Sequence, residues 1–341
     1  MNLNPSQLQA LLAACIPARL PVLVTGAPGI GKSDIIARAA AEADHDLLIS
    51  HPVVEDPTDS KGLPFPAEDG ATARFLPFGD LERALGASKP TVWFLDDLGQ
   101  APTAVQAAKM QLVLARRIGE HVLPDHVTFV AATNRRVDNA GVSNILDPLK
   151  SRFATIVELS TSIEDWTRWA VATNQPPELI AFLRFRPDLL QSKERTREIE
   201  NRESPRTWGN IGKLLRVVPP SLEHQAFAGA VGEAAATEFV SFRRLFREMP
   251  SPDGVLTAPA TAPIPENVAV QYALVTALAR LANPNNFDRV MVYATRLHEA
   301  GLGEFAVLLV RDAVEREPGI VNTPSFITAQ GGPIGAHIRG G

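Results

Sequence analysis

The chain has 341 residues, of which 45% are hydrophobic and 21% charged, so it can bury a large core and form two or three domains. Its net charge of -5 argues mildly against a protein whose main role is to wrap nucleic acid, although a local basic channel remains compatible with it. The single cysteine, Cys15, excludes an internal disulfide and a zinc site built from several cysteines. The N-terminus does not resemble a secretory signal, and no apolar run approaches the roughly 20 residues that span a bilayer. We therefore expect a cytoplasmic protein.

Helical patterns alternate with short apolar runs over the first 160 residues. The first helix is predicted over residues 4–18 and the first strand over residues 20–24. Further strands are predicted at residues 47–49, 91–95, 127–132 and 155–159, and further helices at residues 34–43, 80–87 and 101–117. Two hairpins are expected, one formed by residues 63–65 with 71–76 and one formed by residues 117–125 with the following strand, 127–132. This alternation predicts an α/β fold with a largely parallel sheet.

Glycines and one lysine mark the turn between the first predicted strand and the helix after it. The turn fits the phosphate-loop pattern G-x-x-x-x-G-K-[ST] with residues Gly26, Ala27, Pro28, Gly29, Ile30, Gly31, Lys32 and Ser33. Glycines let the backbone N–H groups approach phosphate oxygens, and a helix N-terminus adds a positive dipole end. Lys32 is expected to reach the β- and γ-phosphates and the Ser33 hydroxyl to bind Mg²⁺. The segment predicts binding of a nucleoside triphosphate.

Polar side chains follow two of the later apolar runs. Asp96 and Asp97 come directly after residues 91–95, and Asn134 follows residues 127–132. Asp96 is expected to hold Mg²⁺, usually through water, and Asp97 to polarise the attacking water. Asn134 can orient that water or contact the γ-phosphate. The alternative for the two aspartates is a solvated carboxylate cluster at a strand end.

Two arginines stand in short motifs further along the chain. Arg152 lies in Ser-Arg-Phe just before the last predicted strand, and Arg206 lies in Ser-Pro-Arg at the start of a helix, where Pro205 suits the first turn. The alternative for Arg152 is a surface ion pair, the commonest fate of an arginine. The neighbouring pairs Arg116–Arg117 and Arg135–Arg136 are expected to form solvated faces or contacts between subunits.

The order of these motifs resembles that of an AAA+ ATPase, and most of all the MoxR-type branch. The resemblance covers about residues 4–218 and depends on the order of the motifs more than on any single one. Residues 58–77 correspond to the helix-2 insertion of that branch, and residues 117–128 to the hairpin before sensor 1. It implies a three-layer α-β-α core over residues 1–160 and a helical lid over residues 161–249. A linker at 250–266 and a helical C-terminal extension at 267–341 complete the expected domains.

The resemblance also implies roles for individual residues. Asn134 would be sensor 1, Arg152 the arginine finger offered to a neighbouring subunit, and Arg206 the sensor 2 arginine. The cofactors would be ATP and Mg²⁺, in a ring that is commonly a hexamer. The chain departs from the family at Asp97, where a glutamate is usual; the side chain is shorter by one methylene, so slow hydrolysis is expected.

The leading functional hypothesis is a chaperone-like ATPase that remodels a protein client or a partner with a von Willebrand factor type A domain. One alternative is a nucleic-acid motor or loader, against which the acidic charge balance counts. A second alternative is a nucleotide-gated switch that binds a partner and scarcely hydrolyses ATP; the departure at Asp97 supports it.

Overall fold

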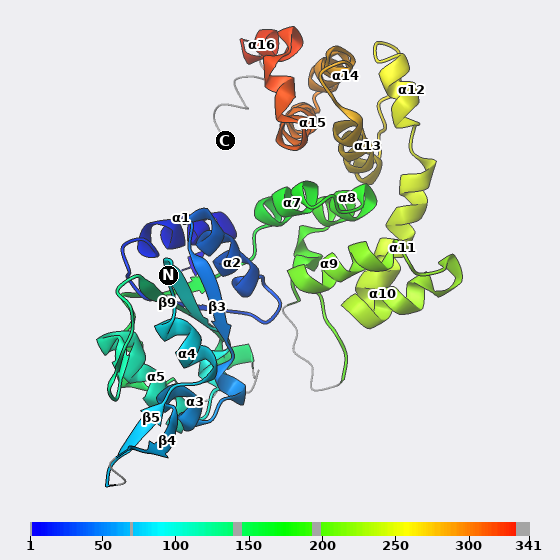
Figure 1. Ribbon diagram of the computed structural model, residues 1–341. Coiled ribbons are helices and arrows are strands. Elements are labelled where there is room, and N and C mark those ends of the chain that lie inside the picture. The colour runs from blue at the N-terminus through cyan, green and yellow to red at the C-terminus, as the bar shows by residue number, and fades with distance from the viewer. Residues whose placement is uncertain (1, 69–70, 139–144, 193–198, 332–341) are drawn as a thin grey trace. The chain divides into compact units, whose positions relative to one another are not determined.

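The computed structural model describes residues 2–68, 71–138, 145–192 and 199–331, and the chain divides into two compact units, residues 1–162 and 163–341 (Figure 1). Each unit is built around its own buried apolar side chains. None of the helices in these described ranges is both long and apolar enough to cross a membrane.

The first unit contains a six-stranded sheet in which every neighbouring pair is parallel. The strand order is β1 (Asn2–Leu3), β10 (Thr155–Leu159), β2 (Val22–Gly26), β9 (Val127–Asn134), β6 (Thr91–Leu95) and β3 (Asp46–Ser50). All five residues of β6 and seven of the eight in β9 are buried, which explains why these strands read as continuous apolar runs.

Helices cover both faces of this sheet. Helices α1 (Pro5–Cys15) and α2 (Lys32–Glu42) share one apolar cluster with Val22 and Val24 of β2. Leu23 points to the other face, where it joins a cluster with α4 (Gly79–Leu85), α5 (Thr103–Ala115) and α6 (Asp147–Lys150). The predicted α/β fold with a three-layer core and a parallel sheet is confirmed.

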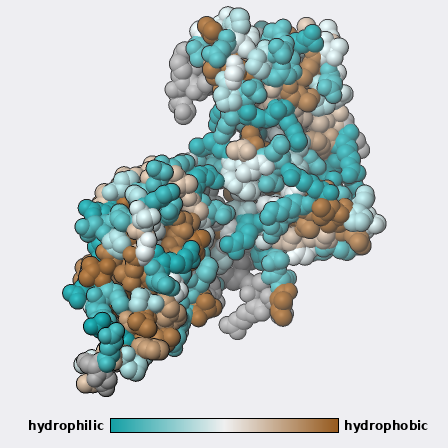
Figure 2. Space-filling view, viewed as in Figure 1, coloured by the Kyte–Doolittle hydropathy of each residue, from teal (hydrophilic) through white to brown (hydrophobic). Residues whose placement is uncertain are grey.

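Two antiparallel hairpins project from the core. The first follows α3 (Pro57–Lys61) and consists of β4 (Leu63–Pro66) and β5 (Ala73–Leu76). The second consists of β7 (Arg117–Ile118) and β8 (His121–Val122). The expected pairing of residues 117–125 with the next strand is wrong, because β9 pairs with β2 and β6 in the main sheet. The imidazole Nε2 of His121 lies 2.8 Å from the carbonyl oxygen of Phe75, so the hairpins contact each other. Every residue of β4 and β5 is exposed, and apolar surface is visible on this unit in Figure 2.

A buried ion pair anchors the chain just before α3. The ammonium of Lys109, in α5, lies 2.7 Å from a carboxylate oxygen of Glu55, and 5.1 Å from the ring centroid of Trp93 in β6. Lys109 is 1% exposed. The segment that leads into the first hairpin is therefore fixed to the core by a charge pair shielded from water.

The second unit is helical. Its helices are α7 (Ile163–Ala172), α8 (Pro177–Phe185), α9 (Pro205–Leu214), α10 (Glu223–Val231), α11 (Glu233–Glu248), α12 (Pro252–Thr257), α13 (Val268–Leu281), α14 (Phe287–Glu299), α15 (Gly303–Arg316) and α16 (Pro324–Gln330). Residues 250–266, expected to be a linker, contain α12, whose Val255 and Leu256 are buried. Helix α13 contributes to both apolar clusters of the unit, so the C-terminal helices and residues 163–249 pack together.

Candidate nucleotide site

The phosphate loop lies where the strand order of the sheet reverses. From β2 the chain builds β3, β6 and β9 on one side of that strand, then crosses to form β10 on the other side. In open parallel sheets this reversal leaves a crevice at the carboxyl ends of the strands, and ligands bind there. β2 ends at Gly26, and α2 begins at Lys32, so residues 27–31 span this position.

Two glycines of the loop are required by its geometry. Gly31 has φ of +100°, a backbone conformation that residues with a side chain rarely adopt. A Cβ atom on Gly26 would lie 3.1 Å from the carbonyl oxygen of Leu159 in β10, tighter than an ordinary contact. The loop therefore leaves the sheet close to its neighbouring strand and turns sharply into α2.

The ammonium of Lys32 lies inside the loop. Lys32 is 7% exposed, and its Nζ donates to the carbonyl oxygens of Gly26 at 3.0 Å and Ala27 at 3.1 Å, and to Oδ1 of Asn134 at 2.8 Å. Asn134 pairs with Gly26 in the register of β9 and β2, which brings the amide to the loop. These three acceptors are neutral oxygens, and an ammonium at a helix N-terminus is placed to bind an anion.

Ser33 and Asp96 provide the oxygen atoms expected for a metal ion. The Ser33 hydroxyl, in the first turn of α2, donates to Oδ2 of Asp96 at 2.8 Å, and Oδ1 of Asp96 accepts from the backbone N–H of Asp97 at 3.0 Å. A hydroxyl and a carboxylate are the hard oxygen ligands that Mg²⁺ prefers. The donor set therefore fits Mg²⁺ beside a bound triphosphate.

The carboxylate of Asp97 is held by a residue that the sequence analysis did not predict. Asp97 has φ of +56° and ψ of 33°, in the left-handed region, and its Oδ1 accepts from Nε2 of Gln100 at 2.9 Å. Oε1 of Gln100 in turn accepts from the hydroxyl of Thr133 at 3.4 Å, one residue before Asn134. The three-residue spacing within one tight turn was the only signal in the sequence that could have indicated Gln100.

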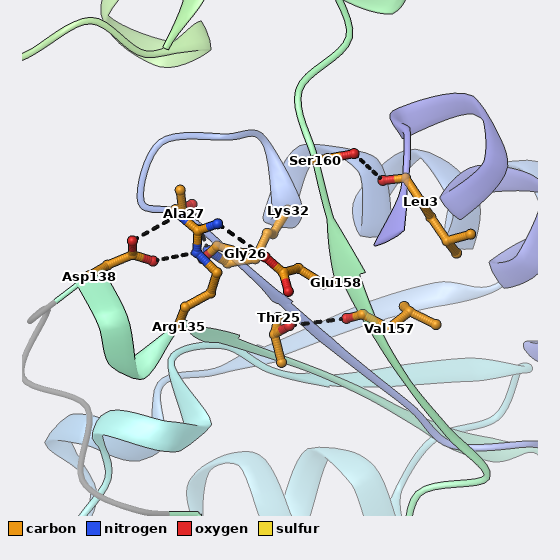
Figure 3. A network of polar contacts seen from close by, with 10 residues as sticks. All are labelled: Leu3, Thr25, Gly26, Ala27, Lys32, Arg135, Asp138, Val157, Glu158 and Ser160. Carbon is orange, nitrogen blue, oxygen red and sulfur yellow. Dashed lines mark hydrogen bonds and ion pairs between the residues drawn. The ribbon is translucent and has the colours of Figure 1, made fainter. Parts of the chain in front are cut away.

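Arg135 joins two strands across the end of β2 (Figure 3). Its guanidinium donates to both carboxylate oxygens of Asp138, each at 2.8 Å, and to Oε1 of Glu158 in β10 at 3.0 Å. The hydrogen bonds to Asp138, followed by the hydrogen bond to Glu158, raise the pKa of Arg135 above its usual range. Arg135 thereby fixes the backbone after Asn134 to the sheet beside the loop.

The two motif arginines belong to other segments of the chain. Arg152 follows α6, and its NH1 donates to the Ser151 hydroxyl at 3.3 Å, while its Nε is buried without a hydrogen-bond partner. Arg206 is exposed in the second unit, in the first turn of α9. Over the described residues, neither arginine forms an ion pair with a carboxylate. The surface ion pair considered for Arg152 is therefore not seen among them.

Among known proteins, the chain is similar to solved structures but matches no family model and no curated sequence. RuvB from Thermotoga maritima, a Holliday junction branch migration motor, is 16% identical with a TM-score of 0.42, and 87% of each chain is covered. NtrX from Brucella abortus, in complex with ADP, is 14% identical with a TM-score of 0.43, over 91% of this chain and 66% of that one. At such low values these neighbours carry no argument about activity, which has to rest on the residues of this chain.

Proposed function

We propose that the protein is an ATPase of the AAA+ class, MoxR type, which binds ATP with Mg²⁺ at the phosphate loop. The observation that carries the proposal is the convergence of three segments at one edge of the sheet. Lys32 lies 2.8 Å from Asn134 at the end of β9, and Ser33 lies 2.8 Å from Asp96 at the end of β6. A glycine-rich turn with no ligand does not require these contacts.

A bound triphosphate would replace the present partners of Lys32. Its phosphate oxygens carry charge, whereas the carbonyl oxygens of Gly26 and Ala27 and the amide of Asn134 do not, so the ammonium binds phosphate more strongly. The Asn134 amide, released from Lys32, is then available to orient a water molecule near the γ-phosphate. Ser33 and Asp96 would hold Mg²⁺, which neutralises charge on the phosphate oxygens when bound.

Two arginines would complete the charge stabilisation. Arg206 would act within its own subunit, and Arg152 would reach the nucleotide of a neighbouring subunit in a ring, which we propose to be a hexamer. The absence of a carboxylate partner for either, among the described residues, supports a role with an anionic ligand, because an arginine already held by a carboxylate would have to break that pair first.

The two projecting hairpins support the MoxR type within this class. They occupy residues 63–76 and 117–122, where the helix-2 insertion and the hairpin before sensor 1 are expected. We propose that ATP hydrolysis remodels or activates a protein client, together with a partner that has a von Willebrand factor type A domain. A mobility shift of single-stranded DNA that weakens with salt would favour a nucleic-acid motor in its place.

A nucleotide-gated switch is the second candidate, and the environment of Asp97 favours it. The short carboxylate is engaged by Gln100 at 2.9 Å, so it has to leave that hydrogen bond or act through a second water to reach an attacking water. ATP binding with turnover that is barely measurable at saturating ATP would select this candidate over a motor.

The experiment that tests the proposal compares Lys32→Ala with Lys89→Ala. Lys89 is an exposed lysine of the same unit and controls for loss of a positive charge. We expect Lys32→Ala to lose ATP binding and hydrolysis with an unchanged circular dichroism spectrum, and Lys89→Ala to keep both. Unchanged ATP turnover in Lys32→Ala would refute the proposed site.

A further inference from the structure

A buried glutamine connects the turn that follows Asp97 to the helix that carries Arg152. Gln106, in α5, is fully buried. Its Nε2 donates to the carbonyl oxygen of Ala101 at 3.0 Å, and its Oε1 accepts from the backbone N–H of Leu146 at 3.0 Å. One side-chain amide therefore binds two backbone groups, the carbonyl oxygen of Ala101 and the N–H of Leu146, which are 45 residues apart in the sequence.

The first of these groups belongs to the catalytic turn. Asp97 and Gln100 are joined both by the hydrogen bond between their side chains and by the backbone N–H of Gln100, which donates to the Asp97 carbonyl oxygen at 2.9 Å. Ala101 follows directly, and its backbone N–H donates to the carbonyl oxygen of Leu98 at 3.3 Å. Asp97, Gln100 and the Ala101 carbonyl oxygen that Gln106 binds therefore belong to one short hydrogen-bonded turn.

The second group begins the segment that ends at Arg152. Leu146 is the residue before α6, and its carbonyl oxygen accepts from the backbone N–H of Leu149 at 2.9 Å. The backbone N–H of Arg152 donates to the carbonyl oxygen of Leu149 at 3.1 Å. Leu149 is fully buried and Phe153 is 7% exposed, and both pack in the same apolar cluster as α5. The segment is a compact turn whose start is set by Gln106.

We propose that Gln106 is a positioning residue that sets Arg152 relative to the Asp97 turn, and so couples the two nucleotide sites that one subunit serves. The inference rests on the proposed function, because it takes Arg152 as the finger for a neighbouring subunit and Asp97 as a group of the subunit's own site. When the γ-phosphate changes the position of Asp97, Gln106 passes that change to Arg152. Hydrolysis at neighbouring sites then depends on the same amide.

Two substitutions break this connection from opposite ends. Gln106→Met keeps a side chain of similar length without polar atoms. Leu146→Pro removes the backbone N–H that donates to Oε1 of Gln106. The φ of Leu146 is -56°, which is compatible with proline. The matched control is Gln271→Met in the second unit, since Gln271 is also a buried glutamine, 5% exposed, whose Nε2 donates to a backbone carbonyl oxygen. Each variant is compared in the full-length protein by ATP binding, hydrolysis and thermal unfolding.

We expect both variants to bind ATP as the wild type does and to hydrolyse it about 10- to 100-fold more slowly, because a mutation far from the reacting atoms that misplaces a catalytic group has effects of up to about that size. The dependence of the rate on ATP concentration should lose its cooperativity. Gln271→Met should keep both the rate and the cooperativity. A double variant of Gln106→Met and Leu146→Pro should be no slower than Gln106→Met alone, because Gln106→Met already removes the hydrogen bond that Leu146→Pro removes.

Mixing experiments separate a misplaced finger from a damaged pocket. A Gln106→Met subunit should regain hydrolysis when mixed with Lys32→Ala, which supplies an intact Arg152, and should regain none with Arg152→Ala. The reverse pattern would overturn the inference, as would wild-type rate and cooperativity in a folded Gln106→Met or Leu146→Pro protein. If wild-type protein failed to hydrolyse ATP, or Lys32→Ala hydrolysed it normally, the proposed function would fail instead.

Discussion

Replacing Arg206 with alanine should make the protein more stable and less active at once. Arg206 is the second residue of α9, which begins at Pro205. The residue before the helix, Ser204, caps it: its side chain accepts a hydrogen bond from the backbone N–H of Thr207. A helix N-terminus carries a partial positive charge, so a cation there is unfavourable. The arginine is exposed, and no carboxylate among the described residues forms an ion pair with it that would offset this repulsion.

The size of the effect follows from this position. Removing a cation from the first turn of an exposed helix is worth about 0.3–1 kcal/mol at low ionic strength. For a unit of roughly 150–250 residues, 1 kcal/mol shifts the melting temperature by about 2–4 °C, so Arg206→Ala should raise it by about 1–4 °C. If Arg206 contacts the triphosphate in the transition state, hydrolysis should fall by about 10²- to 10³-fold, as it does when one donor to a developing negative charge is removed.

Thermal unfolding and single-turnover hydrolysis, each at low and high salt, measure the two effects. The control is Lys213→Ala, which removes an exposed cation from the last turn of the same helix, where a positive charge is favourable. It should lower the melting temperature slightly and leave hydrolysis unchanged, and salt should reduce both temperature shifts. A melting temperature of Arg206→Ala that is lowered, as in Lys213→Ala, would contradict the unfavourable position of this cation, and hydrolysis at the wild-type rate would contradict its contact with the triphosphate.

Two further predictions concern other parts of the chain. Asp97→Asn should bind Mg²⁺–ATP through Asp96 and lose about 10²- to 10⁴-fold in single-turnover rate. Asp97→Glu should match or exceed the wild-type rate if the reach of the carboxylate alone limits hydrolysis. Equal rates in wild type and Asp97→Asn would show that Asp97 is structural and would favour the nucleotide-gated switch. Burial raises the pKa of Tyr293 to about 12, and its hydroxyl donates to the Pro263 carbonyl oxygen at 3.0 Å. Because the folded-state pKa is raised, its contribution to stability should be complete below pH ~10 and be lost as pH rises to about 12. In denaturant unfolding over this pH range, the free energy of unfolding of Tyr293→Phe should decline less than that of the wild type. Equal declines in the two proteins would contradict this role of Tyr293.

The sequence predicted those parts of the site that depend on one strand and the residue after it. The phosphate loop follows β2, and Asp96 and Asn134 end β6 and β9, because a parallel sheet brings the carboxyl ends of its strands to one edge. Each of these residues could be found without knowing which strands are neighbours. The same holds for the fold class, since buried parallel strands leave an unmistakable apolar run.

The residues that sequence analysis missed depend on contacts between distant elements. Gln100 binds Asp97 only because Asp97 takes a left-handed backbone conformation, which nothing in an Asp-Asp pair predicts. Arg135 reaches Glu158 only because β9 and β10 both pair with β2, so its role requires the strand order. Gln106 reads as an ordinary polar residue of a helix until α6 is placed beside it. These three contacts belong to tertiary structure, which local patterns do not specify.

The most direct test of the central claim is hydrolysis by a mixture of two inactive variants. Lys32→Ala lacks a working pocket and keeps Arg152, and Arg152→Ala lacks the finger and keeps its pocket. If one subunit's Lys32 and its neighbour's Arg152 act on the same ATP, an equal mixture should regain activity at the interfaces where a working pocket faces a working finger, about a quarter of those in randomly mixed rings. We expect hydrolysis well above either variant alone, rising with protein concentration. No gain on mixing, or an Arg152→Ala protein as active as the wild type, would contradict a nucleotide site shared between subunits.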